Sequence, residues 1–301
     1  MTAFLASLAH DDLAPATLRG YRYDLLHFLA WHGTVQNNPF TLEGLAEYEL
    51  IAYRQHMVAA GRRPATINRR LDALRRLCRW ARGTGMLSVD AAGNVRPMRT
   101  IRNRQPVGLT DVEIHALLRA AGASSHGLAA RNYALVQLML QAGLRVGEVA
   151  ALKVGDITMS DRSGSVRIRQ GKGLKARDVP LNATARRALK QHLDHRQVGR
   201  QVPGRDAPLF VSSRETAMPV RTIQSVIASI ARRARLKRVA VSAHTLRHSF
   251  ALGYLRDNPG KLLELAGLLG HESLDTTVVY TRPSRDDLAA DLERSHLNVD
   301  G

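Results

Sequence analysis

The sequence predicts a mainly α-helical chain of two domains, with a small β-sheet confined to the second domain. Apolar residues recur at three- and four-residue spacings through residues 1–96, which is typical of packed helices. The stretch 97–107 contains a proline at each end and has no periodicity, so it separates two folded parts. Residues 165–169 alternate between apolar and polar side chains, as a half-buried strand does. At 301 residues the chain is long enough for two domains and a sizeable core.

Helices are expected throughout the N-terminal domain, residues 1–96. The patterns predict one helix around residues 18–29, a second over 43–60, and a third that begins near Thr66 and ends at Gly83. The third helix carries a single apolar stripe, formed by Ile67, Leu71, Leu74, Leu77 and Ala81.

Arginines occupy much of the remaining surface of this third helix. Because the guanidinium group can bind a phosphate through two hydrogen bonds, such a helix can lie in or along a DNA groove. The alternative is a solvated basic face with no ligand. The residues assigned to DNA on this helix are Arg69, Arg70, Arg75 and Arg76.

Residues 97–107 form a basic linker that includes Arg102 and Arg104, and two DNA-binding domains joined in this way could close around a duplex. A new domain is expected over residues 108–285, since Thr110 and Glu113 have the spacing of a capping box. The last residues, 286–301, form a separate tail.

The second domain is expected to be mixed α/β. Helices are predicted over 111–121, 129–142, 184–195 and 222–234, and two strands over 165–169 and 177–181 are joined by a turn at 171–173. The helix near 222–234 is the second candidate for a DNA groove, through Arg221 and Arg232.

The composition favours a polyanionic partner, most simply nucleic acid. The formal net charge is +18, and 38 of the 44 basic residues are arginine. A solvated basic surface is the alternative. Cys78 is the only cysteine, which excludes an internal disulfide and fits a reducing compartment. No signal peptide or membrane span is predicted, so a cytoplasmic, nucleoid-associated protein is expected.

One stretch near the C-terminus concentrates groups that can bind or attack a phosphate. It contains His244, Arg247, His271 and Tyr280 on short elements separated by apolar helix. Cutting a DNA strand without a metal requires cations around the phosphate, a nucleophile such as tyrosine, and an acid for the leaving oxygen. No metal or cofactor is expected, because His271-Glu272 is not followed by a histidine at position 275 and Gly171-Lys172-Gly173 is not a nucleotide-binding loop.

The order of these motifs resembles the tyrosine recombinase (integrase) family, particularly its Xer-like and transposon-resolving members. The likeness rests on Gly143-Leu144-Arg145-Val146-Gly147-Glu148, a hairpin lysine, His244-Thr245-Leu246-Arg247-His248, Leu268-Leu269-Gly270-His271, and Tyr280 nine residues further on. Residues 66–75 also resemble that family's helical core-binding domain. The resemblance spans about residues 10–285 and implies a core-binding domain followed by a catalytic domain.

The resemblance implies a role for each motif residue. Arg145 and Arg247 would clamp the scissile phosphate, His244 would act as a general base or phosphate ligand, and His271 would donate to a phosphate oxygen. Lys172 would protonate the 5′ oxygen, with Lys175 as its rival, and Tyr280 would be the nucleophile. Glu148 is expected to hold Arg145 or cap its helix, and His248 to pack, with an accessory role left open.

The implied function is site-specific DNA recombination through a 3′-phosphotyrosyl intermediate and a Holliday junction. The chain would bind double-stranded DNA with inverted half-sites as a homodimer and form a tetramer on synapsis, and the need for a partner recombinase or accessory protein stays open. The tail would dock on a neighbouring protomer or fold back on its own domain. The alternatives are a type IB topoisomerase and a non-catalytic architectural or regulatory DNA-binding protein.

Overall fold

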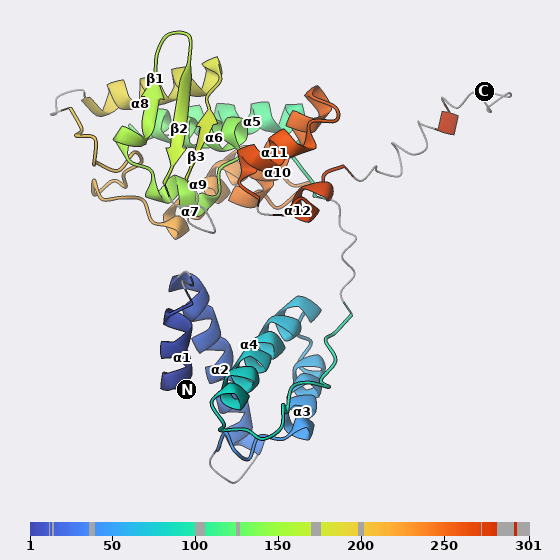
Figure 1. The fold of residues 1–301 in the computed structure, drawn as a ribbon. Helices are drawn as coiled ribbons and strands as arrows, with labels where there is room; N and C mark the ends of the chain where they lie inside the picture. Colours follow the sequence, from blue (N-terminus) through green and yellow to red (C-terminus); the bar gives the residue numbers. More distant parts are fainter. Residues whose placement is uncertain are drawn as a thin grey trace. The chain divides into compact units, whose positions relative to one another are not determined.

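The chain folds into two compact units, Met1–Arg104 and Gln105–Gly301, which are drawn in Figure 1. The computed structural model describes residues 1–11, 13, 15–35, 40–99, 106–124, 127–169, 176–197, 202–271, 273–281 and 292–293. The predicted linker therefore lies partly outside the described residues, and the tail lies almost wholly outside them. The expected fold class is confirmed, since helices predominate and one small sheet lies in the second unit.

The first unit is entirely helical in its described part. Its helices are α1 (Thr2–Ala9), α2 (Pro15–Val35), α3 (Glu47–Ala59) and α4 (Pro64–Gly83). The apolar stripe predicted on α4 is buried and packs against α2 and α3. Helix α3 begins four residues later than predicted, because residues 43 and 44 form a turn and the amide of Ala46 donates to the Glu49 carboxylate instead.

Aromatic side chains fill the centre of this first unit. The ring of Tyr53 lies 5.1 Å from that of Phe28 and 5.0 Å from that of Trp31, measured between ring centroids. Tyr53 and Phe28 are almost fully buried, so α2 and α3 are fixed against each other by ring packing.

The second unit combines eight α-helices with three strands in its described part. The helices are α5 (Asp111–Gly122), α6 (Ala129–Ala142), α7 (Val146–Ala151), α8 (Ala183–Gln197), α9 (Val220–Arg233), α10 (Ala243–Asp257), α11 (Leu262–Leu269) and α12 (Asp275–Val278). A single 3-10 turn, η1 (Val154–Asp156), leads into the sheet, whose strands are β1 (Ile157–Met159), β2 (Gly164–Ile168) and β3 (Arg177–Pro180).

Helix α6 is the centre of this unit and packs against α5, α8 and α10. Its side chains are buried over most of its circumference, including every apolar residue from Ala134 to Ala142. The sheet is antiparallel in the order β1-β2-β3, with Val166 opposite both Ile157 and Val179. Strand β1 was missing from the prediction because three residues are too few to show an alternating pattern.

Helices α10, α11 and α12 follow one another at one corner of the unit, shown in orange to red in Figure 1. A small apolar cluster of Ala251, Leu265, Leu269 and Tyr280 joins them. This cluster brings the end of α12 against the face of α10. No helix in the described part of the chain is both long and apolar enough to cross a membrane.

Candidate active site

A cavity of about 670 Å³ in the second unit contains most of the residues singled out from the sequence. Arg145, His244, Arg247, His271 and Tyr280 all line it. They come from the start of α7, from α10, from the turn after α11 and from the residue pair after α12. The sixth predicted residue, Lys172, and its rival Lys175 lie outside the described residues.

Helix α10 contributes four of the lining residues, and three of them, His244, Arg247 and His248, lie on one helical face. The helix begins after Ser242, whose hydroxyl accepts a hydrogen bond of 3.2 Å from the amide of Thr245. This N-cap fixes the first turn, and so fixes where the histidine of that turn enters the cavity.

Arg247 is 3% exposed and is held mainly by backbone carbonyl groups. Its guanidinium donates to the carbonyl of Gly143 at 2.7 Å and to that of Leu269 at 2.8 Å. These carbonyls lie at the C-terminal ends of α6 and α11, where the helix dipole favours a cation. Burial lowers the pKa of Arg247 to about 10, and the nearby Arg145 acts in the same direction.

Arg145 lies closer to solvent and is oriented in a similar way. It donates to the carboxylate of Glu148 at 2.9 Å and to the carbonyl of Gly270 at 2.9 Å. Both guanidinium groups therefore line one cavity, and carbonyl groups at neighbouring helix ends hold them in place. This geometry suits an oxyanion with two non-bridging oxygens, such as a phosphodiester, whose negative charge increases in the pentacoordinate transition state.

Two glycines make these arrangements possible. Gly143 and Gly270 end α6 and α11 with φ of 60° and 62°, a left-handed conformation that other residues rarely adopt. A Cβ atom at Gly143 would lie 2.2 Å from a ring carbon of Phe250, and one at Gly270 would lie 2.7 Å from the guanidinium of Arg177. A side chain at either position would displace a neighbour of the cavity.

Glu148 links the start of α7 to the sheet. Its carboxylate accepts from the amide of Arg145 at 2.8 Å, from the Arg145 guanidinium, and from both terminal nitrogens of Arg177 on β3. Burial opposes its charge, but the hydrogen bonds from Arg177 and Arg145 outweigh it, so the pKa of Glu148 is lowered. Its predicted structural role is confirmed, whereas Arg177 was recognised only as a strand residue.

His271 is held in a defined tautomer. Its Nε2 lies 2.8 Å from Nη2 of Arg247, and its Nδ1 lies 2.7 Å from the hydroxyl of Thr277. A guanidinium can only donate, so Nε2 accepts and the proton is on Nδ1. Burial, together with the nearby Arg247 and Arg145, lowers the pKa of His271 to about 4.

His244 and Tyr280 complete the set. Burial lowers the pKa of His244, as do Arg247 and Arg145. Tyr280 is 9% exposed, and burial raises the pKa of its phenol although Arg247 counteracts part of the effect. Its hydroxyl lies 2.8 Å from Nδ1 of His248, a contact absent from the prediction. The spacing of four residues from His244 already placed His248 on the cavity face, and it was interpreted as packing.

The arginines assigned to DNA on α4 differ in exposure. Arg69 is half exposed and pairs with Asp24, while Arg75 and Arg76 are partly buried and pair with Asp72 and Asp11. The prediction of a groove-facing Arg70 is wrong in this structure. Its side chain is 7% exposed, because it turns inward toward the buried carboxylate of Asp24 and donates to His27 at 2.9 Å.

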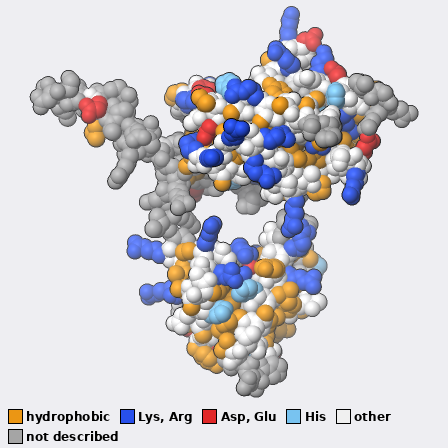
Figure 2. All heavy atoms as spheres, turned by 180° about the vertical axis from the view of Figure 1, so that it is seen from behind, with side chains coloured by type: hydrophobic (Ala, Val, Ile, Leu, Met, Phe, Trp, Pro, Cys, Tyr) orange, Lys and Arg blue, Asp and Glu red, His pale blue; other side chains and the backbone are white. Residues whose placement is uncertain are grey.

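The other DNA-binding candidates fall into two groups. Arg221 and Arg232 are exposed on the same face of α9, whereas Arg102 and Arg104 lie outside the described residues. On the face drawn in Figure 2, Lys and Arg side chains are spread over both units and outnumber the acidic side chains. Among the described residues, no cluster of three or more His, Cys, Asp or Glu side chains could hold a metal ion.

Comparison with known proteins identifies both units. Residues 108–286 match the phage integrase family, and residues 1–85 match the phage integrase N-terminal SAM-like domain. The chain is 32% identical to tyrosine recombinase XerC of Corynebacterium efficiens, over 93% of this chain and 85% of that protein. It is 31% identical to tyrosine recombinase XerD of Caulobacter vibrioides, over 98% and 95% of the two chains.

Solved structures agree in fold. XerH recombinase bound to its difH substrate in a pre-cleavage complex has a TM-score of 0.71 at 25% identity, over 92% of this chain and 79% of that one. A lambda integrase tetramer bound to a Holliday junction has a TM-score of 0.71 at 18% identity, over 94% and 78%. The chain belongs to the phage integrase family and is a tyrosine recombinase, an enzyme that breaks and rejoins DNA at specific sites.

Proposed function

We propose that the second unit cleaves one DNA strand by attack of Tyr280 on a phosphodiester bound in the cavity between α7 and α10. The observation that carries this proposal is the convergence of two arginines, three histidines and a buried tyrosine on one cavity of about 670 Å³. These residues come from distant parts of the sequence, and a purely structural site would not need two arginines beside three histidines of lowered pKa.

The two arginines would bind the non-bridging oxygens of the scissile phosphate. Arg145 and Arg247 already point into the cavity, and their carbonyl partners keep them oriented before DNA arrives. Preorganised donors stabilise the charge of a pentacoordinate transition state without reorganisation during the reaction.

The histidines would act around the same phosphate. In the DNA-free protein the low pKa values keep His271 neutral at pH 7, and the pKa of His244 is shifted in the same direction. A bound phosphodiester anion favours the charged forms and so raises both pKa values. His271 would then donate to a phosphate oxygen, and His244 would serve as a phosphate ligand or general base.

Lys172 would protonate the leaving 5′ oxygen, with Lys175 as the alternative. In this scheme the bond from the Tyr280 oxygen to phosphorus forms while the bond from phosphorus to the 5′ oxygen breaks. The product is a 3′-phosphotyrosyl ester and a 5′ hydroxyl. A 5′ hydroxyl from the partner duplex then displaces the tyrosine. One phosphoester replaces another, so the exchange needs no energy source or cofactor.

The assembly that fits this chemistry is a homodimer on inverted half-sites and a tetramer when two duplexes pair through a Holliday junction. Lambda integrase has the same fold and has been solved as a dimer bound to a core site and as a tetramer bound to a Holliday junction. On this chain, Arg221 and Arg232 of α9 and the exposed arginines of α4 would contact the DNA, with the linker arginines between the units. Such a protein would work in the cytoplasm, at the nucleoid.

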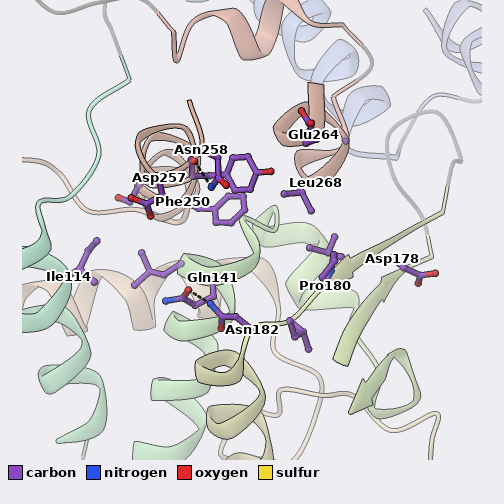
Figure 3. Close-up of a pocket in the computed structure, with 17 residues that line it drawn as sticks. Ile114, Gln141, Asp178, Pro180, Asn182, Phe250, Asp257, Asn258, Glu264 and Leu268 are labelled. Carbon is purple, nitrogen blue, oxygen red and sulfur yellow. Dashed lines mark hydrogen bonds between the residues drawn. The ribbon is translucent and has the colours of Figure 1, made fainter. Parts of the chain in front are cut away.

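The C-terminal tail would dock on a neighbouring protomer. A second cavity, of about 790 Å³, lies between β3, α10 and α11, and Figure 3 shows Phe250 and Leu268 among the side chains that point into it. The tail supplies two leucines at helical spacing, Leu288 and Leu292, and Leu292 is 72% exposed. An occupant would press on residues next to Gly143 and Leu269, whose carbonyls hold Arg247. Docking and assembly of the site would thereby be coupled.

The chemistry is tested with a nicked duplex that carries the binding site recovered by selection from random DNA. We expect a protease-sensitive adduct on the 3′ end of the cut strand, and its loss in Tyr280→Phe with DNA binding unchanged. Tyr133→Phe removes a phenol of α6 that lines neither of these two cavities, and this variant should still form the adduct. An adduct that persists in Tyr280→Phe would rule out the assigned nucleophile.

Tail docking is tested by mixing two inactive proteins. One lacks residues 286–301 but keeps Tyr280, and the other is full-length Tyr280→Phe. If the tail acts between protomers, the mixture recovers cleavage by the truncated chain. If the tail folds back on its own domain, the mixture stays inactive.

A further inference from the structure

His248 is the residue after Arg247 on α10, and it contacts the atom that would attack phosphorus. Its Nδ1 lies 2.8 Å from the hydroxyl oxygen of Tyr280, with the two ring centroids 5.5 Å apart. Of the side chains that the structure describes, His248 is the one hydrogen-bonded to this hydroxyl. A catalytic role for this pair rests on the proposed function.

The surroundings of His248 leave it neutral. The ring of His244 lies edge-on at 4.4 Å between centroids, and Arg247 adjoins it on the same helix. Burial lowers the pKa of His248 to about 4, and both neighbours add to the effect. A neutral imidazole keeps one nitrogen with a free lone pair, and with the proton on Nε2 that nitrogen is Nδ1, which faces Tyr280.

Tyr280 needs such an acceptor. Burial raises the pKa of its phenol, so the hydroxyl stays protonated in the empty site at neutral pH. A protonated phenol is a weak nucleophile, and its proton must leave as the bond to phosphorus forms. A base within hydrogen-bond distance of that proton meets the geometric requirement for general base catalysis, and His248 Nδ1 is at that distance.

We propose that His248 is the general base for Tyr280. The phenol O–H bond breaks and its proton moves to Nδ1 of His248 while the oxygen–phosphorus bond forms. The phosphorus–5′ oxygen bond breaks, and that oxygen receives a different proton from the acid assigned to Lys172. In the rejoining step the imidazolium returns its proton to the departing phenol oxygen. His244 is left as a ligand of the phosphate.

The test compares two substitutions of His248 on two substrates. Asparagine keeps an acceptor oxygen near the position of Nδ1 but is not a base, and phenylalanine keeps only the ring. The substrates are the selected nicked duplex with its normal 5′ oxygen and the same duplex with sulfur at that bridging position. A thiolate leaves without protonation, so sulfur removes the need for an acid but not the need for a base.

We expect His248→Asn and His248→Phe each to slow single-turnover cleavage of the oxygen substrate by about 10²-fold or more. Sulfur should rescue Lys172→Ala and should not rescue either His248 variant. DNA affinity and thermal unfolding are measured in parallel to show that the variants fold. His115→Asn makes the same exchange at an exposed position on α5 and should cleave like the parent chain.

Full activity of His248→Asn would reduce His248 to a holding contact and overturn the proposal, as would rescue of the His248 variants by sulfur. If the unmodified chain forms no adduct with either substrate, the proposed function itself fails. A measurement without DNA still examines the pair in that case. The ¹⁵N NMR spectrum of the free protein should show His248 protonated on Nε2, and a proton on Nδ1 would contradict the assignment.

Discussion

Replacing Gly143 with alanine should disturb the stability of the second unit and its chemistry together. The left-handed backbone conformation costs a non-glycine residue about 1–2 kcal/mol. The new Cβ would lie 2.2 Å from a Phe250 ring carbon and 3.0 Å from a Leu269 methyl, so neighbours must move. Overpacking of this kind costs about 1–3 kcal/mol. The loss in unfolding free energy is therefore about 2–5 kcal/mol in all.

Thermal unfolding and single-turnover cleavage measure the two consequences. For a unit of this size we expect the Tm to fall by roughly 5 °C or more, at about 2–4 °C per kcal/mol. Cleavage should fall as well, because the Gly143 carbonyl holds Arg247. Gly147→Ala is the matched control, since no atom lies within 4 Å of its added Cβ. The double variant Gly143→Ala/Phe250→Leu should lose the steric clash but keep the free-energy cost of the left-handed backbone at position 143. Equal Tm values for the Gly143 and Gly147 variants would refute the reasoning.

Three further outcomes are expected. Arg247→Lys should reduce single-turnover cleavage by about 10²-fold or more with folding intact, because one ammonium group cannot replace a guanidinium that spans two carbonyls. Arg70→Ala should lower the unfolding free energy of the first unit by about 3 kcal/mol in urea, because the buried carboxylate of Asp24 loses one partner. Arg79 is exposed, so Arg79→Ala should instead lower DNA affinity. Equal urea unfolding of the two variants would contradict a structural role for Arg70. The pKa of Glu148 is lower in the folded than in the unfolded chain, so its ion pairs stabilise the fold above the unfolded pKa near 4.5, and that stabilisation is lost as the pH falls through the lower folded pKa. Glu148→Gln should therefore weaken the pH dependence of the unfolding free energy on the acid side. An unchanged pH dependence there would argue against a stabilising role for these ion pairs.

The helical parts of the fold were largely predictable because burial follows periodicity. The stripe from Ile67 to Ala81 and the cap at Thr110 were both readable as patterns along one segment. The inward turn of Arg70 was not, since it depends on a buried Asp24 that lies 46 positions away in another helix. The same limit applies to β1, which is defined only by its pairing with β2.

The site residues also fall into those that local motifs predict and those that depend on contacts distant in the sequence. Residue types and order were enough to select Arg145, Arg247, His271 and Tyr280, because each motif is local. Arg177 was missed, because its importance comes from contacts with Glu148 and with the carbonyl of Leu268, and both partners are distant in the sequence. The sequence pattern also does not show which backbone carbonyls accept hydrogen bonds from the arginines, because every residue has one.

The contact between His271 and Thr277 allows Nε2 of His271 to change from a hydrogen-bond acceptor to a hydrogen-bond donor. In the free protein the ring accepts from Arg247 through Nε2 and donates to the fully buried Thr277 hydroxyl through Nδ1. A phosphate oxygen, unlike a guanidinium, needs a donor. A hydroxyl can donate as well as accept, so rotation of the Thr277 hydroxyl allows the proton to reside on Nε2 instead. The ring thus has a second way to donate to a phosphate oxygen, beside the uptake of a proton that a bound anion favours.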